Sequence, residues 1–193
     1  MLFCVEFDTI LKMKQNYNTI FYIFSLILLL NTTCCNLKAA TTQVTTRSTA
    51  KVAAYFQEDC ETAIIKEINL ARKEIQLAMY TFTKPSIYKA LAKAQRRRVK
   101  VEVKYDAEVG EWEGMQKAIV YMEKAGIICT EIVPIKGETG KMHNKYIIAD
   151  QKVVITGSYN YTTAATILNY ENIVVIYSSQ IAKKFYQNFT EIK

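Results

Sequence analysis

From Lys51 to the C-terminus, short apolar runs alternate with longer segments that repeat apolar residues at helical spacing. The apolar runs predict strands at 51–56, 74–80, 99–106, 128–134, 145–150, 152–158 and 171–177. The periodic segments predict helices at 60–72, 84–98, 111–126 and 178–189. Because strands that alternate with helices bury a sheet on both faces, we expect an α/β fold, an α-β-α sandwich with a mixed β-sheet flanked by helices.

Several residues at the ends of these segments agree with the assignment. Pro85 suits the first turn of a helix, and Gly126 suits the position just after the last turn of another. The pair Asp150–Gln151 predicts a tight turn between two strands, and Ser178 or Ser179 is a suitable N-cap for the last helix.

The N-terminal part of the chain differs from the rest in composition. Lys12 and Lys14 precede an apolar run at 20–30, which is interrupted only by Ser25. Eleven residues match the apolar region of a signal peptide and fall short of the ~20 that span a bilayer as a helix. We therefore interpret 1–40 as a signal peptide, with an uncleaved membrane anchor as the alternative. Residues 41–50 form a Thr-containing linker, and 51–193 form one domain.

The remaining domain is basic. The chain has 25 Lys and Arg residues against 18 Asp and Glu, and only three of the former and two of the latter lie in 1–40. A basic domain suits an anionic partner, either nucleic acid or an anionic membrane surface. A charge that only keeps the protein soluble is the competing interpretation.

The chain has a single histidine, His143, and five cysteines, without any CxxC pair. Zinc sites draw on several His and Cys residues at characteristic spacings, so a zinc site is not expected. Cys60 and Cys129 are the two cysteines within the domain, and we expect two separate thiols, although an exported protein allows a disulfide.

The segment 143–160 carries the candidate chemistry. Lys145 lies two positions after His143, and Asn160 lies two positions after Ser158. Residues two apart point to the same face of an extended strand, so a hairpin of the two segments brings these groups to one anion. A neutral imidazole can attack phosphorus, and a lysine and an amide can stabilise the charge that develops on the phosphate oxygens. The leaving alkoxide needs an acid, for which a second imidazole is suited.

One chain supplies one imidazole, whereas a two-fold axis brings two copies of the segment face to face. The spacing HxK(x)4D(x)6GSxN resembles the signature of the phospholipase D superfamily. The residues that match it are His143, Lys145, Asp150, Gly157, Ser158 and Asn160. Single-motif members of that superfamily include small bacterial endonucleases and mitochondrial cardiolipin hydrolase-type proteins that work as homodimers. The resemblance extends over roughly 51–193.

The resemblance implies a role for each matching residue. It makes His143 of one chain the nucleophile and His143 of the other the general acid, with Lys145 and Asn160 binding phosphate and Ser158 in support. It implies that Glu171 orients the histidine, that Asp150 and Gly157 are structural, and that neither a metal nor another cofactor is needed.

Four further features have a competing structural interpretation. The basic cluster Arg96–Arg98 with Lys93 and Lys100 suits a polyanion, but cations also stabilise a helix C-terminus. Tyr159 and Tyr161 are candidates for stacking on bases or meeting lipid headgroups, whereas Trp112 is expected to be a packing residue.

The sequence leaves three functions open. The first is an exported, periplasmic or secreted, non-specific nuclease that acts on DNA or RNA. The second is a phospholipase D that hydrolyses phosphatidylcholine or cardiolipin at a membrane, favoured if residues 20–30 remain as an anchor. The third is a non-catalytic module that binds nucleic acid or membrane. The motif does not choose between the first two, because the chemistry at phosphorus is the same.

Overall fold

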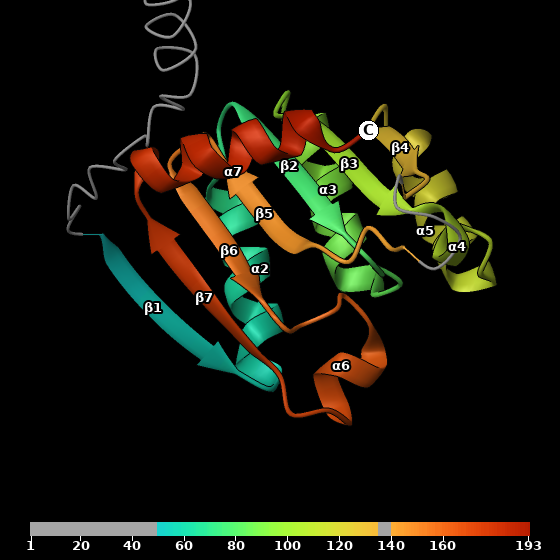
Figure 1. The fold of residues 1–193 in the computed structure, drawn as a ribbon, viewed down its shortest axis with the longest axis horizontal. Helices are drawn as coiled ribbons and strands as arrows, with labels where there is room; N and C mark the ends of the chain where they lie inside the picture. The colour runs from blue at the N-terminus through green and yellow to red at the C-terminus, as the bar shows by residue number, and fades with distance from the viewer. Residues whose placement is uncertain (1–49, 135–139) are drawn as a thin grey trace, which may run out of the picture. The chain divides into compact units, whose positions relative to one another are not determined.

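Seven strands form one mixed sheet in the computed structural model, which describes residues 50–134 and 140–193. The strand order is β1-β7-β6-β5-β2-β3-β4, in which β2, β3 and β4 are parallel and the other neighbours are antiparallel (Figure 1). The strands are β1 (Lys51–Phe56), β2 (Glu74–Met79), β3 (Lys100–Asp106), β4 (Ile128–Ile132), β5 (Lys145–Ala149), β6 (Val153–Gly157) and β7 (Asn172–Tyr177).

Helices cover both faces of this sheet. The helices α2 (Glu58–Leu70), α3 (Pro85–Arg96) and α5 (Glu113–Glu123) lie on one face, and α7 (Ser179–Glu191) crosses the other (Figure 1). The predicted α-β-α sandwich with a mixed sheet is therefore confirmed. Two short helices, α4 (Ala107–Gly110) and α6 (Thr163–Ile167), were not predicted, because a single helical turn is too short to show apolar periodicity.

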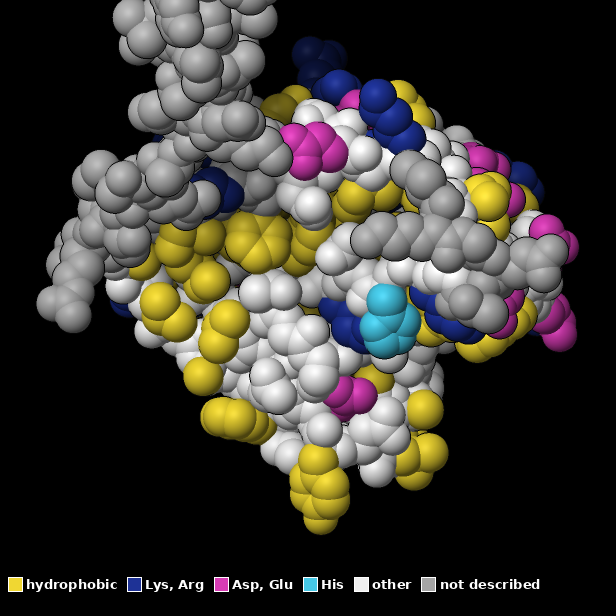
Figure 2. Space-filling view, viewed as in Figure 1, with side chains coloured by type: hydrophobic (Ala, Val, Ile, Leu, Met, Phe, Trp, Pro, Cys, Tyr) yellow, Lys and Arg dark blue, Asp and Glu magenta, His cyan; other side chains and the backbone are white. Residues whose placement is uncertain are grey.

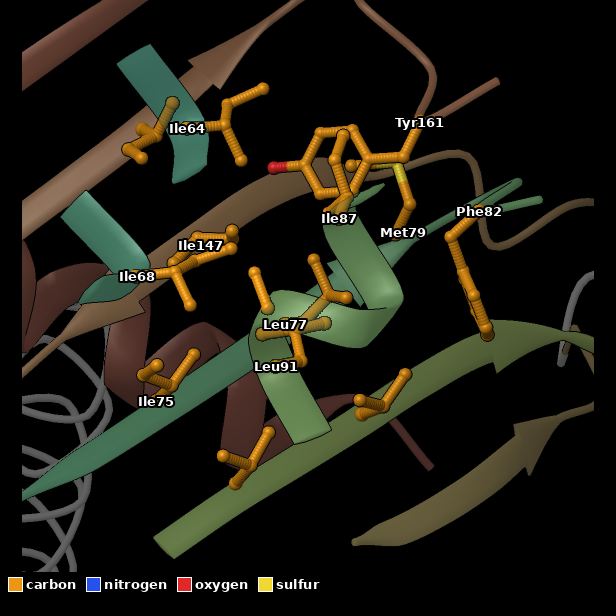
Figure 3. Packing of buried hydrophobic residues seen from close by; sticks show 14 of the residues in the cluster. Ile64, Ile68, Ile75, Leu77, Met79, Phe82, Ile87, Leu91, Ile147 and Tyr161 are labelled. Atoms are coloured by element: carbon orange, nitrogen blue, oxygen red, sulfur yellow. The ribbon is translucent and has the colours of Figure 1, made fainter. Parts of the chain in front are cut away.

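Each face of the sheet has its own hydrophobic core. Ile64 and Ile68 of α2 pack with Leu77 of β2 and Leu91 of α3 on one face (Figure 3). Successive residues of a strand point to opposite faces, so Ile148 belongs to the second core, under α7. The central strands are buried on both faces for this reason, and they read as continuous apolar runs.

The predicted turn and cap residues lie where the sequence places them. Pro85 is the first residue of α3, and Gly126 follows α5 with a φ of 83°. Asp150 and Gln151 both have positive φ values, of 52° and 50°, in the turn between β5 and β6. The hydroxyl of Ser178 caps α7 by accepting a hydrogen bond from the backbone N–H of Ile181 at 3.3 Å.

The register defines two ends of the sheet. Met79 of β2 pairs with Lys145 of β5 at one end, which we call the site end. Glu74 at the start of β2 pairs with Lys100 of β3 at the other end. Glu74 and Met79 are five positions apart, which separates these ends by about 17 Å at roughly 3.3 Å per residue.

Asp150 joins two loops at the end of the sheet opposite the site end. Its carboxylate accepts hydrogen bonds from the backbone N–H groups of Arg72, Lys73 and Glu74, at distances from 2.7 to 3.2 Å. Partial burial opposes ionisation of this carboxyl, but the three backbone donors outweigh it and lower its pKa below the usual value. The structural role expected for Asp150 is what this geometry supports.

Replacing Asp150 by alanine is expected to lower the free energy of unfolding by about 2 kcal/mol, because three backbone donors lose a charged acceptor. Since the carboxyl pKa is lowered in the folded state, its stabilisation is present above the unfolded pKa of about 3.9 and is lost as pH falls through the folded value. Denaturant titrations of Asp150→Ala should therefore differ most from wild type near neutral pH. The exposed-acid control Glu111→Ala should unfold like wild type, and equal losses in both variants would contradict the role of Asp150.

The signal-peptide or anchor segment at 1–40 and most of the linker at 41–50 lie outside the described residues. Within the described part of the chain, none of the helices has the length and apolar character needed to cross a bilayer. Cys60 in α2 and Cys129 in β4 are free thiols.

Candidate active site

His143 and Lys145 project together at the site end of the sheet. Lys145 is the first residue of β5, and His143 lies two residues earlier, before the strand begins. The segment is held there because the backbone N–H of Tyr80 donates to the carbonyl of Asn144 at 2.9 Å. The Nζ atom of Lys145 is 3.2 Å from Nδ1 of His143 and 3.4 Å from its Nε2. The predicted pairing of the two side chains is present, although His143 precedes the strand.

The aromatic ring of Tyr80 forms one wall beside the imidazole. The two ring centroids are 4.6 Å apart at an interplanar angle of 52°. The ammonium groups of Lys141 and Lys145 lie 5.8 and 5.5 Å from the centre of the Tyr80 ring. Figure 2 shows the imidazole in cyan at the surface, with dark-blue cationic side chains beside it. Sequence reasoning missed Tyr80, whose only signal is its position directly after a buried strand that ends at the site.

The surroundings of His143 favour its neutral form. Partial burial and the positive charges of Lys145 and Lys141 lower the imidazole pKa below 6.5, against an opposing effect of Asp106. Burial also lowers the pKa of Lys145, which the carboxylate of Glu171 partly opposes. An ammonium only donates hydrogen bonds, so the imidazole nitrogen that receives one from Lys145 carries a lone pair. The pair therefore suits a nucleophile beside a cation.

Asp106 fixes the backbone just before His143. Its side chain is 1% exposed at the end of β3, and its carboxylate accepts from the backbone N–H of Met142 at 2.6 Å. The same carboxylate accepts from the backbone N–H of Glu108 at 3.1 Å, which caps α4. Asp106 thus positions the His143 segment against β3, a long-range contact without any local sequence signal.

Ser158 and Glu171 form one hydrogen-bonded unit at the ends of β6 and β7. The hydroxyl of Ser158 donates to the Glu171 carboxylate and accepts from the backbone N–H of Asn172 at 3.1 Å. The amide of Asn169 also donates to Glu171, at 3.1 Å. Ser158 is therefore engaged within the fold, and its support for phosphate binding stays a prediction. The orientation of His143 by Glu171 also stays a prediction, since the side-chain hydrogen bonds of Glu171 to described residues are with Ser158 and Asn169.

Asn160 carries an unsatisfied polar atom. Among the described residues, its Oδ1 atom is buried and has no hydrogen-bond partner. Buried amide groups are normally paired, so an orphaned one is a site where a further partner is expected to bind. The Oδ1 atom only accepts hydrogen bonds, so its missing partner is a donor and not a phosphate oxygen. Phosphate binding would use the Nδ2 donor of Asn160, and this role stays a prediction.

Of the remaining predicted residues, two occupy structural positions and three have a different exposure from the one expected. Gly157 lies in β6 beside β7, which leaves no room for a side chain, and Asp150 is at the far end of β5 from Lys145. Tyr159 and Tyr161 are 1% and 2% exposed, so the expectation that they stack on bases or lipid headgroups is wrong. Trp112 is 52% exposed, so its expected packing role is also wrong. Residue type alone does not reveal which side of the chain faces the core.

The described residues contain no group of three or more His, Cys, Asp or Glu side chains arranged to hold a metal ion.

Comparison with known proteins identifies the family. Residues 64–193 match the family described as "Cardiolipin synthase, PLD-like domain". The chain belongs to the phospholipase D superfamily. It is similar to mitochondrial cardiolipin hydrolase of Mus musculus, with 32% identity over 129 residues, which is 67% of this chain and 56% of the relative. It is also similar to phospholipase D of Rickettsia typhi, with 34% identity over 131 residues, or 67% of this chain and 61% of that one.

Solved structures of the superfamily share the fold. Nuc from Salmonella typhimurium, a phospholipase D family member, matches with a TM-score of 0.66 and 28% identity over 75% of this chain and 94% of its own. NucT from Helicobacter pylori matches with a TM-score of 0.68 and 25% identity over 75% of this chain and 96% of its own. The chain therefore spans nearly all of these two structures, but about half to three fifths of the mouse and Rickettsia typhi relatives.

The acid limb of the pH–rate profile should respond to Lys141. Its ammonium group lowers the pKa of His143, so Lys141→Gln is expected to raise that pKa toward 6.5. A nucleophile must be neutral, and the rise of kcat/KM with pH should therefore occur at higher pH in Lys141→Gln than in wild type. The control Lys117→Gln removes an exposed lysine that pairs with Glu113 on α5. An acid limb that shifts equally in both variants, or in neither, would show that Lys141 does not tune His143.

Proposed function

We propose that this protein hydrolyses phosphodiester bonds without a metal, through a covalent phosphohistidine formed on His143. The observation that carries the proposal is the placement of a surface imidazole with lowered pKa at 3.2 Å from the ammonium of Lys145. The imidazole supplies the lone pair, and the lysine faces the oxygens on which negative charge develops. Membership of the phospholipase D superfamily supports this chemistry.

The reaction proceeds in two displacements. In the first, a nitrogen of His143 bonds to phosphorus as the bond from phosphorus to one ester oxygen breaks, and that oxygen leaves as an alcohol after taking a proton. In the second, water attacks phosphorus, gives up a proton, and releases a phosphomonoester together with the free imidazole. Lys145 and the amide of Asn160 stabilise the phosphate oxygens in both steps.

The proton donor and acceptor is His143 of a second copy of the chain. The chain has one histidine, and one imidazole cannot serve as nucleophile and acid in the same step. A two-fold axis beside His143 places the second imidazole on the opposite side of the scissile bond. The protein therefore acts as a homodimer with one active site at the interface.

Exposed apolar side chains in and after α6 suit this interface. Ile167, Leu168 and Tyr170 are 68%, 75% and 95% exposed, and they lie between Asn160 and Glu171 along the chain. Large apolar side chains grouped at a surface mark sites of association. We assign them to the contact with the second chain.

We propose nucleic acid as the substrate. His143 is exposed between Lys141 and Lys145 at an open surface, which suits a polyanion whose diesters are all alike. The resemblance of the motif to that of small bacterial endonucleases supports the same choice, and the N-terminal segment directs the enzyme to the periplasm or outside the cell.

Phospholipid is the alternative substrate. The relatives named phospholipase D and mitochondrial cardiolipin hydrolase, at 34% and 32% identity, favour it. In this case the N-terminal segment acts as a membrane anchor, with possible contact through residues 20–30, and the enzyme cleaves phosphatidylcholine or cardiolipin.

The test is a parallel assay of the full-length chain in EDTA against plasmid DNA, RNA, and vesicles of phosphatidylcholine or cardiolipin. We expect nicking of DNA or cleavage of RNA that EDTA does not abolish. Cleavage of vesicle lipid without cleavage of nucleic acid would establish the alternative. Absence of all three activities, with retained binding, would leave a binding module and overturn the proposal.

A further inference from the structure

Six exposed cationic side chains gather at the end of the sheet opposite His143. They come from the loop before β2, the last turn of α3 with the residues after it, and the start of β3. This basic pole consists of Arg72, Lys73, Arg96, Arg97, Arg98 and Lys100. The backbone N–H of Lys100 donates to the carbonyl of Lys73 at 2.9 Å, so the segments form one continuous surface.

Carboxylates at this end of the sheet, from Glu74, Glu102 and Asp150, offset only part of the charge of the six cations. Among ion pairs between described residues, only one includes a member of the pole, from Lys100 to Glu102 at 2.8 Å. The carboxylate of Asp150, which lies nearby, accepts from three backbone N–H groups and forms no ion pair with the pole among the described residues. The guanidinium of Arg97 donates to the carbonyls of Ile68 and Asn69, which satisfies its hydrogen bonds without neutralising its charge.

The basic pole does not hold the diester that is cleaved. Lys100 pairs with Glu74 at the start of β2, and Lys145 pairs with Met79 at its end. The length of β2 therefore separates the pole from the catalytic pair by about 17 Å. Figure 1 shows that β2 and β3 run from the pole toward the side of the sheet where α4 lies.

The chain enters the domain at the same end as the basic pole. Strand pairing links Lys51 of β1 to Tyr177 of β7, which pairs with Val153 of β6. Val153 pairs with Ala149 of β5, which pairs with Ile75 of β2. The first residue of β1 is thus level with the start of β2 (Figure 1). Twenty residues, 31–50, separate the apolar run at 20–30 from Lys51. The apolar segment is therefore joined, through these twenty residues, to the end of the domain at which the basic pole lies.

We propose that the N-terminal segment stays uncleaved and that the basic pole docks on the anionic phospholipid headgroups of the bilayer that this segment contacts. Two weak attachments on one chain act together, because the first raises the local concentration of the second. Cations close to an anionic leaflet are attracted within about one Debye length, which is roughly 10 Å at 0.1 M salt. Docking through this pole points His143 away from that membrane, toward soluble substrates.

The test compares two triple variants of the full-length chain with equal loss of charge. Arg96→Gln/Arg98→Gln/Lys100→Gln removes half of the basic pole and leaves Arg97, which bonds to the backbone, in place. The control removes three exposed lysines of α3, α5 and α7 outside the pole, as Lys89→Gln/Lys117→Gln/Lys184→Gln. Co-sedimentation is measured with vesicles of phosphatidylcholine alone and with about a third phosphatidylglycerol, at about 0.1 M salt.

Wild type and the control should partition at least about tenfold better onto the anionic vesicles, and the pole variant should lose most of this preference. Equal preference in the two triple variants, or none in wild type, would overturn the proposal. If the pole variant lost binding to DNA but kept its preference for anionic vesicles, the pole would be a nucleic-acid surface instead. His143→Ala should retain the vesicle preference, so a failure of docking is distinguishable from a failure of catalysis.

Discussion

Replacing His143 by alanine is expected to lower kcat for phosphodiester cleavage by about a thousandfold or more, because the bond to phosphorus is made by this imidazole. The side chain is exposed, and its contacts are with Lys145 and Tyr80. Its removal should therefore leave the fold intact. The measurement is single-turnover cleavage of a labelled diester by the purified chain, with thermal unfolding recorded in parallel.

Two controls separate a nucleophile from a residue that only shapes the site. The exposed Lys89→Ala variant on α3 should cleave at the wild-type rate. Rapid quenching of wild type should trap a phosphoenzyme that is labile in acid and stable in base, as phosphohistidine is, and His143→Ala should trap none. Substantial turnover by His143→Ala, or a trapped adduct in that variant, would refute the assignment.

Replacing Gly157 by alanine is expected to lower the free energy of unfolding by about 3 kcal/mol. A Cβ atom at this position would lie 2.1 Å from the carbonyl oxygen of Asn172 and 2.8 Å from Cα of Ile173. Both atoms belong to the backbone of β7, which pairs with Gly157, so the strands must separate. Ser158 and Asn160 follow directly, so activity should fall as well.

The matched control for this change is Gly114→Ala in α5. Its added Cβ would meet the Cγ2 atom of Thr83 at 3.0 Å, which is a side-chain methyl group that can rotate away. Alanine also favours a helix over glycine by about 1 kcal/mol. Denaturant unfolding should therefore show a large loss for Gly157→Ala and little change for Gly114→Ala. Comparable losses in the two variants would contradict the account of close strand packing.

The sequence predicted the order of strands and longer helices because each spans enough residues for its periodicity to appear. Strands β2 and β5 were recognised from continuous apolar runs, and the pairing of His143 with Lys145 from a spacing of two. The helix α6 was missed because a five-residue helix has no such pattern. An element was predicted where it is long enough for its pattern of apolar residues to repeat, and missed where it is shorter.

Contacts between residues that are far apart in the sequence could not be predicted from local patterns. Asp106 reaches the backbone of Met142 across the end of the sheet, and Tyr80 contacts His143 from the position directly after β2. The motif residue Asp150 is close to Lys145 in sequence, yet the length of β5 separates the two. Likewise, only the register of the strands shows that the basic cluster at Arg96–Arg98 lies far from the site. The spacing of residues along a strand indicates which face of the sheet their side chains share. Only the pairing of strands shows which residues lie close together in space.

The claim that one chain holds half of an active site is tested most directly by mixing subunits. Wild-type and His143→Ala chains are unfolded together and refolded at equal amounts, and cleavage is measured per total chain. If each site needs His143 from both copies, only the dimers with two wild-type chains act, and activity should fall to about one quarter of the wild-type value. Activity of about one half, in proportion to the wild-type chains present, would show that each chain works alone and would contradict the half-site.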